Sequence, residues 1–323
     1  MPENIPQNSL TAENSASDQG HVQKAVGGGP TFALLAYGSW GFVPIYWKLV
    51  GAVPAGQMVA HRIIWSLVTV SFFFWQLKSR RELTSVLCSP HRLAWMFGSA
   101  IFLSSNWLLF VWAVQQKLLL QVSLGYFINP LVNVLLGALL LKEHLNKLQI
   151  SAFVIASIGV CIYSWGLNSF PVTSILLALT FGIYGLMRKK APVEPMVGLA
   201  VESILLLPLA LGYLLWQYQA GLLVFGSGAE FAAGSTWPLT LLILCSGPIT
   251  SFPLLWFAHA ARRLKLSTLG FFQYLAPSMQ FALAVFLYKE PFSLTHFLAF
   301  LFIWSAICIY VIDSLRRRQH TAA

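Results

Sequence analysis

The stretch LLLQVSLGYFINPLVNVLLGALLLKEHL at 118–145 returns in altered form as RLKLSTLGFFQYLAPSMQFALAVFLYKEPF at 263–292. Each copy has a hydroxyl residue, then Leu-Gly and two aromatic residues, then a proline and a Lys-Glu pair. The matching segments are Ser123–Phe127 with Thr268–Phe272, Pro130 with Pro277, and Lys142-Glu143 with Lys289-Glu290. Internal similarity of this kind predicts two related structural units.

The repeat extends beyond the opening stretch. Residues 109–127 match 254–272 at an offset of 145, and residues 130–163 match 277–310 at an offset of 147. The difference between the offsets predicts a two-residue insertion near 273–276. The alternative is that the two halves are similar only because apolar segments are built from few residue types. Against it, both blocks keep Gly, Pro, Glu and Cys in step without gaps.

The composition is that of a membrane protein. The chain of 323 residues is 57% hydrophobic and 9% charged, whereas soluble domains carry about 25% charged residues. A spanning helix needs about 20 apolar residues, and the long apolar runs lack the alternation of an outer-membrane barrel. The sequence predicts an all-α protein with ten spans, at roughly 31–50, 56–77, 94–114, 118–141, 148–166, 171–187, 196–216, 237–260, 265–288 and 294–313.

The basic residues predict the orientation. With a cytoplasmic N-terminus, sixteen Lys and Arg residues fall inside and three, Lys48, Lys117 and Lys289, fall outside. This asymmetry follows the positive-inside rule, so the net charge of +10 does not indicate nucleic-acid binding. Both termini are then cytoplasmic, and the expected location is the plasma membrane. The family resemblance described below implies the inner membrane of a bacterium.

Five spans per half is an odd number, so the second half enters from the opposite face. The expected architecture is therefore an inverted 5+5 repeat, with a substrate site near the midplane between the halves. The expected divisions are a disordered N-terminal tail at 1–29, a first five-helix repeat at 30–166, a second at 167–315 and a basic tail at 316–323.

Several segments resemble the EamA-type drug/metabolite transporters, and among them the RarD group of permeases. The resembling residues are Trp40-Gly41, His61–Ser66, Asn106–Phe110, Ser123–Asn133, Leu264–Gln273 and Glu290. The resemblance covers about 30–315. It implies a secondary transporter that moves a small organic molecule by alternating access, with no cofactor or metal.

Arg62 and Glu202 are the candidate charged groups of the pathway. A charge within a span is costly and usually faces a cavity or a partner. Aligning Ala60 with Ala200 puts the two at equivalent places in the repeat. We expect Arg62 to attract an anionic substrate group and Glu202 to couple protons. The alternatives are a static structural pair, or two side chains that reach toward opposite interfaces.

The prolines mark the candidate site. Proline removes a backbone donor and kinks or breaks a helix, and the carbonyls that it frees can serve a ligand in a cavity. The site is expected between Pro130 and Pro277, with Arg62 above it and Glu202 below. The alternative is an ordinary structural kink. The remaining candidates for the substrate pathway are Tyr37, Trp40, Asn106, Tyr126, Asn129, Phe271, Gln273 and Tyr274.

Other readings of these residues stay open. The aromatic residues could instead form the interfacial belt, and Asn106 could bond a neighbouring helix. Glu143 and Glu290 are candidate helix-end or gate residues, although solvated helix ends carry similar charges. An intramembrane enzyme or a non-transporting sensor are the rival functions, but no nucleophile, metal or Walker motif is present. The sequence does not determine the substrate, the coupling ion or the oligomeric state.

Overall fold

The computed structural model describes residues 28–77, 80–116, 118–165, 170–225, 238–287 and 294–322. Its regular elements are helices, which confirms the expectation of an all-α membrane protein. They are α2 (Gly29–Leu49), α3 (Ala55–Leu77), α4 (Arg80–Leu87), α5 (Pro90–Gln115), α6 (Leu119–Leu140), α7 (Lys147–Trp165), α8 (Val172–Lys190), α9 (Pro195–Gln219), α10 (Leu239–Arg263), α11 (Leu266–Gln273), α12 (Leu275–Ala282), the π-helix η1 (Leu283–Leu287) and α13 (Leu294–Ala322).

Within the described residues, seven helices are long and apolar enough to cross a membrane. They are α5 to α10 and the segment Leu266–Leu287. The helices α2 and α3 are also long, with 21 and 23 residues. They are not among the seven, and they carry Trp, Tyr, Gln, His or Arg side chains between their apolar residues. Those polar and aromatic residues include several that line the cavity described below.

Some expected segments differ at their ends. Residues 1–27 of the expected tail lie outside the described residues, as do Lys289 and Glu290. The basic residues after 315 continue α13 instead of following it. The short helix α4 was not expected, because it is too short and polar to span. Leu83 and Val86, one turn apart, face inward, and α4 packs against α5 and α9.

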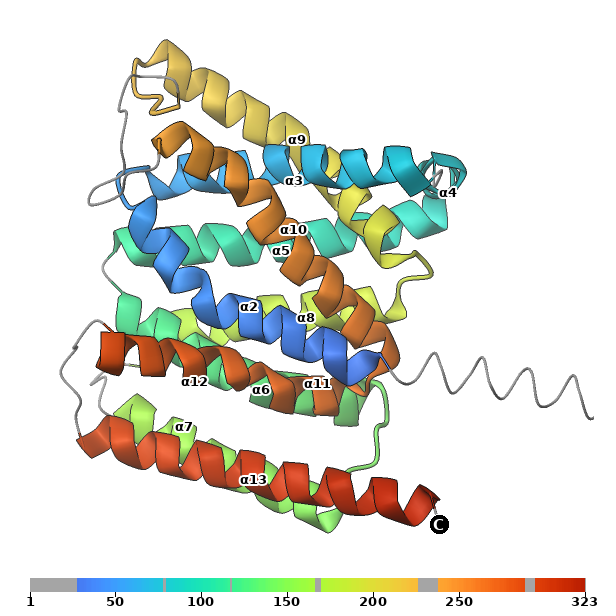
Figure 1. Ribbon diagram of the computed structural model, residues 1–323, viewed down its shortest axis with the longest axis vertical. Coiled ribbons are helices and arrows are strands. Elements are labelled where there is room, and N and C mark those ends of the chain that lie inside the picture. Colours follow the sequence, from blue (N-terminus) through green and yellow to red (C-terminus); the bar gives the residue numbers. More distant parts are fainter. Residues whose placement is uncertain are drawn as a thin grey trace, which may run out of the picture.

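The helices lie across the long axis of the molecule (Figure 1), with α9 at one end and the pair α7 and α13 at the other. The start of α2 and the C-terminus lie on the same side of the bundle, at the right in Figure 1. Between the two ends, α2 packs against α10 and α12, α3 against α9 and α10, α5 against α8 and α9, and α6 against α8 and α11.

The two copies of the opening stretch have different backbones. The first copy is one helix, α6, which continues through Pro130. The second copy is broken at Tyr274 between α11 and α12, and then widens into η1. Pro277 has no N–H to donate to the Gln273 carbonyl, so the break lies where the missing bond would have been. It also lies in the region of the expected insertion.

Candidate functional site

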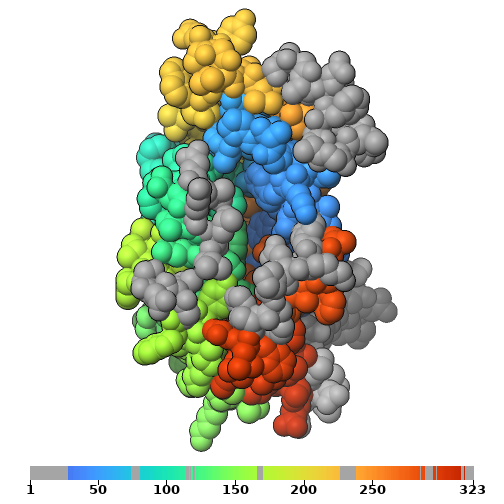
Figure 2. Space-filling model, turned by 90° about the vertical axis from the view of Figure 1, so that its left-hand side faces the viewer, coloured from blue at the N-terminus to red at the C-terminus, as the bar shows by residue number. Residues whose placement is uncertain are grey.

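A cavity of about 140 Å³ lies in the middle of the bundle. Its walls come from α2, α3, α5 and α6 of the first half and from α8, α10, α11 and α12 of the second. Figure 2 looks onto the side of the bundle opposite the termini, and there the surface is hollowed between the blue residues of α2 and α3 and the green residues of α5 and α6. The lining residues are Tyr37, Trp40, Val43, Trp47, Arg62, Asn106, Trp107, Phe110, Val122, Gly125, Tyr126, Asn129, Leu177, Phe181, Leu254, Gln273, Ala276, Pro277 and Gln280.

Arg62 carries the charge of this cavity. Its Nε donates to the Thr250 hydroxyl on α10 at 3.0 Å. Its guanidinium carbon lies 4.6 Å from the ring centroid of Trp107 and 5.4 Å from that of Trp47. Such contacts are favourable cation–π interactions. Arg62 is therefore held by a neutral hydroxyl and two ring faces, and no carboxylate of the described residues lines the cavity.

Amide side chains hold another part of the lining. Asn133 lies one helical turn after Asn129 on α6, and its Nδ2 donates to Gln273 Oε1 at 2.6 Å and to Asn129 Oδ1 at 3.5 Å. The first of these bonds joins α6 to α11, so the two copies of the repeat meet at this wall. Asn133 was not among the expected residues, although a residue four positions after Asn129 shares its helix face.

Asn106 bonds a neighbouring helix and also lies in the cavity wall. Its Nδ2 donates to the Leu177 carbonyl at 2.9 Å and to the Thr180 hydroxyl at 3.0 Å, so it bonds the neighbouring helix α8. It also lines the cavity. Because both donor bonds go to α8, the amide oxygen remains as the group that a ligand could reach.

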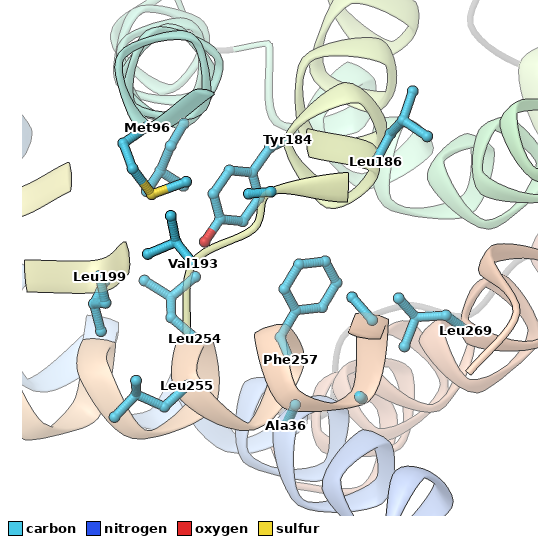
Figure 3. Packing of buried hydrophobic residues seen from close by; sticks show 14 of the residues in the cluster. Ala36, Met96, Tyr184, Leu186, Val193, Leu199, Leu254, Leu255, Phe257 and Leu269 are labelled. Carbon is cyan, nitrogen blue, oxygen red and sulfur yellow. The ribbon is translucent and has the colours of Figure 1, made fainter. Parts of the chain in front are cut away.

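Aromatic rings separate the cavity from the side of the bundle where the start of α2 and the C-terminus lie. Trp40 contacts Phe181 at 5.7 Å between ring centroids, and Phe181 contacts Tyr184 at 5.7 Å. Tyr184 stacks on Phe257 at 5.8 Å, and the two rings face each other in Figure 3 among Met96, Val193 and Leu254. Tyr37, Tyr184 and Phe257 are fully buried, so this packing is dense and closes that side.

Pro130 and Pro277 do not occupy equivalent places. Both are buried, but only Pro277 is among the lining residues. The Pro130 carbonyl lies against Gly270, where a Cβ would come within 2.6 Å of it. Pro130 therefore belongs to the close packing of α6 on α11, which only glycine permits at position 270.

Phe271 and Tyr274 also lie outside the lining, in a second core with α7 and α13. The ring of Phe271 stacks on Tyr310 with centroids 3.9 Å apart. Tyr274 is buried, and its hydroxyl has no hydrogen-bond partner in the described part of the chain. Of the twelve expected pathway residues, the cavity brings together Tyr37, Trp40, Arg62, Asn106, Tyr126, Asn129, Gln273 and Pro277.

Glu202 belongs to a different polar site. Its Oε1 accepts a hydrogen bond from the Ser99 hydroxyl at 2.5 Å and lies 3.5 Å from Arg188 Nη1. Arg188 also donates to the Pro195 carbonyl at 2.9 Å. Both charged side chains are 1% exposed. Glu202 therefore does not line the cavity, and the contacts of Arg62 and Glu202 are separate.

Arg188 was counted among the cytoplasmic loop charges, although its burial could have been anticipated. The buried positions of α8 include Ser174, Leu177, Ala178, Tyr184 and Gly185. Arg188 continues that spacing of three and four residues, which marks one face of a helix. A second signal is Gly198, where a Cβ would overlap the Arg188 guanidinium.

Glu143 connects the two repeat copies at their ends. It follows the end of α6, and its carboxylate accepts hydrogen bonds from the Leu266 N–H at 2.7 Å and the Ser267 N–H at 3.0 Å. The Ser267 hydroxyl also donates to it at 2.7 Å. A carboxylate at a helix N-terminus is favourable because it meets unpaired N–H groups.

Lys189 binds the Ala261 and Leu264 carbonyls at the end of α10.

Comparisons with known proteins identify the family. The model of the EamA-like transporter family matches residues 28–165. An uncharacterized transporter from Vibrio cholerae serotype O1 is 43% identical over 299 residues, which cover 93% of this chain and 95% of that protein. Protein RarD from Escherichia coli (strain K12) is 38% identical over 294 residues, covering 91% and 97%. The chain is a RarD-like member of the EamA-like transporter family.

Membership of the EamA-like family agrees with the fold. A protein of known crystal structure matches with a TM-score of 0.66 at 17% identity, over 88% of this chain and 97% of that one. Its identity is too low to carry more than the fold. As a RarD-like EamA protein, the chain is a multi-pass protein of the bacterial inner membrane, and its family implies a small-molecule substrate.

Proposed function

We propose that this protein is a secondary transporter that carries a small organic molecule across the plasma membrane by alternating access. The observation that carries the proposal is the central cavity, because both halves of the chain contribute its walls and it holds Arg62 among aromatic rings. Ligand sites of this kind are concave and mostly apolar, with a few fixed polar groups. Transporter sites lie between two repeats.

The proposed architecture is ten spans in two inverted halves, with both termini cytoplasmic. Helix contacts support it, because exchanging the halves turns several of the main contacts into others. The contact of α6 with α8 corresponds to that of α2 with α12, and the contact of α5 with α8 to that of α2 with α10. Two bonds also correspond, Tyr163 with Ser123 at 3.4 Å and Tyr310 with Thr268 at 2.7 Å.

Rearrangement at the cytoplasmic end would open the second state. The aromatic layer around Tyr184 and Phe257 and the Glu143 contact to α11 lie on the side of the termini. In the proposed cycle these contacts separate while the opposite side closes. Glu143 is then a gate residue, because its three hydrogen bonds join two segments that must part. The matching proposal for Glu290 concerns a residue outside the described ranges.

Proton coupling through Glu202 is the second part of the proposal. Its Oε2 is buried and has no hydrogen-bond partner among the described residues. A buried carboxylate oxygen without a donor is costly when ionised, so a proton at Oε2 would relieve that cost. Tyr184 contacts Phe181, a residue of the cavity wall. Coupling would then be indirect, through the packing between the Glu202 site and the cavity.

The test is accumulation of a labelled solute in proteoliposomes under an imposed pH gradient. Benzoate derivatives, aromatic amino acids and chloramphenicol form the first panel. We expect the wild type to accumulate one of them, and Glu202→Gln to lose accumulation while retaining exchange at equal concentrations. If Glu202→Gln accumulates solute as the wild type does, the coupling role is wrong. If no solute of a broad panel crosses with either protein, an intramembrane enzyme or a sensor becomes the better explanation.

A further inference from the structure

The charge of the cavity indicates what it binds. Among the lining residues, all within the described ranges, Arg62 alone carries a charge. Its Nε is used by Thr250, and two indole rings lie against the group. Its Nη1 and Nη2 have no hydrogen-bond partner in the described part of the chain. Two parallel N–H donors are therefore free, in the geometry that binds a carboxylate through both oxygens.

The unpaired guanidinium of Arg62 favours the binding of an anionic ligand. Arg62 is half-buried, and a charge that loses part of its hydration without gaining a partner is costly. The ion pair in the described part of the chain is that of Arg188 with Glu202. No carboxylate of the cavity wall can neutralise Arg62. A bound anion would supply the missing countercharge. Its binding would therefore remove the cost of holding an unpaired charge.

The remaining walls fit one ring. The rings of Trp40, Trp107, Tyr126 and Phe181 line the cavity. Its volume is about 140 Å³, and an apolar cavity of about 150 Å³ binds benzene. Offset and edge-to-face contacts of these rings with a flat aromatic substrate would add to the burial of apolar surface.

The amide groups favour acceptors over an ammonium. Asn133 donates to the oxygens of Asn129 and Gln273, which leaves the NH₂ groups of both residues as donors. A primary ammonium would meet these donors and the Arg62 charge. The Asn106 amide oxygen could accept a hydrogen bond from it, but no carboxylate among the described lining residues could pair with it. The cavity therefore disfavours amines and zwitterionic amino acids.

We infer that the substrate is a monocarboxylate with a single aromatic ring and no ammonium group, such as an arylacetate or arylpropionate. Its carboxylate binds Nη1 and Nη2 of Arg62, and its ring lies among Trp40, Trp107 and Phe181. The inference rests on the proposed function, since it names the class of molecule that the transport cavity takes.

Calorimetric titration of the purified full-length protein in detergent tests the substrate class. The probes are phenylacetate, phenylalanine, phenethylamine and cyclohexylacetate. We expect phenylacetate to bind about tenfold or more tightly than each of the others, because it alone has both the anion and the flat ring without an ammonium. If phenethylamine or phenylalanine binds as tightly as phenylacetate, the inference is overturned.

Variants of Arg62 give a second test. Charged hydrogen bonds contribute about 1.5–3 kcal/mol, so Arg62→Gln should bind phenylacetate about 10- to 100-fold more weakly. Arg62→Lys keeps the charge without the paired donors and should be intermediate. Arg92→Gln is the matched control, because Arg92 is half-buried at the start of α5, bonds Ser85 and is not a lining residue of the cavity. Binding by Arg62→Gln equal to that of the wild type would overturn the inference.

Exchange in proteoliposomes separates the two proposals. Labelled phenylacetate is used at neutral pH, and uptake by protein-free liposomes is subtracted. Exchange that depends on Arg62 supports both. Tight binding without exchange of any solute would refute transport and leave the substrate class supported. Exchange of an amine, with no binding of phenylacetate, would refute the substrate class and leave transport supported.

Discussion

Arg62 and Glu202 occupy equivalent positions in the aligned halves, yet their surroundings differ. Arg62 faces a cavity and is held by a hydroxyl and two indole rings. Glu202 is fully enclosed, bonded by Ser99 and paired with Arg188. Removing Arg62 leaves no buried countercharge among the described residues, whereas removing a partner of Glu202 leaves one. The difference predicts that the Glu202 site matters more for stability and the Arg62 site more for binding.

Arg188→Ala should have the largest effect on stability. It leaves the Glu202 carboxylate buried without its cation, and breaking such a pair costs about 3–5 kcal/mol. The free energy of unfolding in mixed micelles measures the loss. The double variant Arg188→Met with Glu202→Leu removes both charges and should recover most of it. An Arg188→Ala protein as stable as the wild type would show that the pair contributes nothing to the fold.

Gly198→Ala should have the next largest effect. The added Cβ would overlap the Arg188 guanidinium, so the side chain must leave its place beside Glu202. Overpacking costs about 1–3 kcal/mol, measured in the same unfolding assay. Gly212→Ala on the same helix is the matched control, because nothing lies within 4 Å of its Cβ position. Equal stability of the two variants would contradict the close approach at Gly198.

Arg62→Gln should have the smallest effect on stability, within about 1 kcal/mol of the wild type. The lost cation–π contacts contribute about 0.5–1 kcal/mol, and the cost of holding an unpaired charge is removed with them. The unfolding assay is paired here with the phenylacetate titration. A large loss of stability would place Arg62 with Arg188 as a structural charge and remove the contrast between the two sites.

Much of the candidate site followed from the sequence. Arg62 and Asn106 are candidates because a charged or polar residue in an apolar span usually faces a partner or a cavity, and Gln273 is one because it lies close to Pro277. Asn133 and Arg188 follow the helical spacing of Asn129 and of the buried face of α8, so they could have been found as well. The sequence could not have assigned Phe271 and Tyr274 to the cavity wall or to the packed core, because an aromatic residue suits both equally.

The repeat did not determine the local backbone. Both copies of the opening stretch have a proline, but α6 continues through Pro130 while the second copy breaks at Tyr274. The expected insertion near 273–276 indicated where the backbones of the two copies would differ. Whether an insertion breaks a helix or is absorbed by it depends on packing. Here Gly270 brings α11 against Pro130, and that contact exists only in the folded molecule.

The sequence by itself determined the helical class, the membrane environment and the family. The length and composition of the apolar segments are properties of the chain itself and do not depend on how its helices pack. It also selected eight of the nineteen residues that line the cavity. Only the tertiary structure decided which cation pairs with Glu202, that Arg62 has no countercharge among the described residues, and that Pro277 rather than Pro130 lines the cavity. Those outcomes depend on which helices pack together, and a charge is costly or favourable only through what the neighbouring helices place beside it.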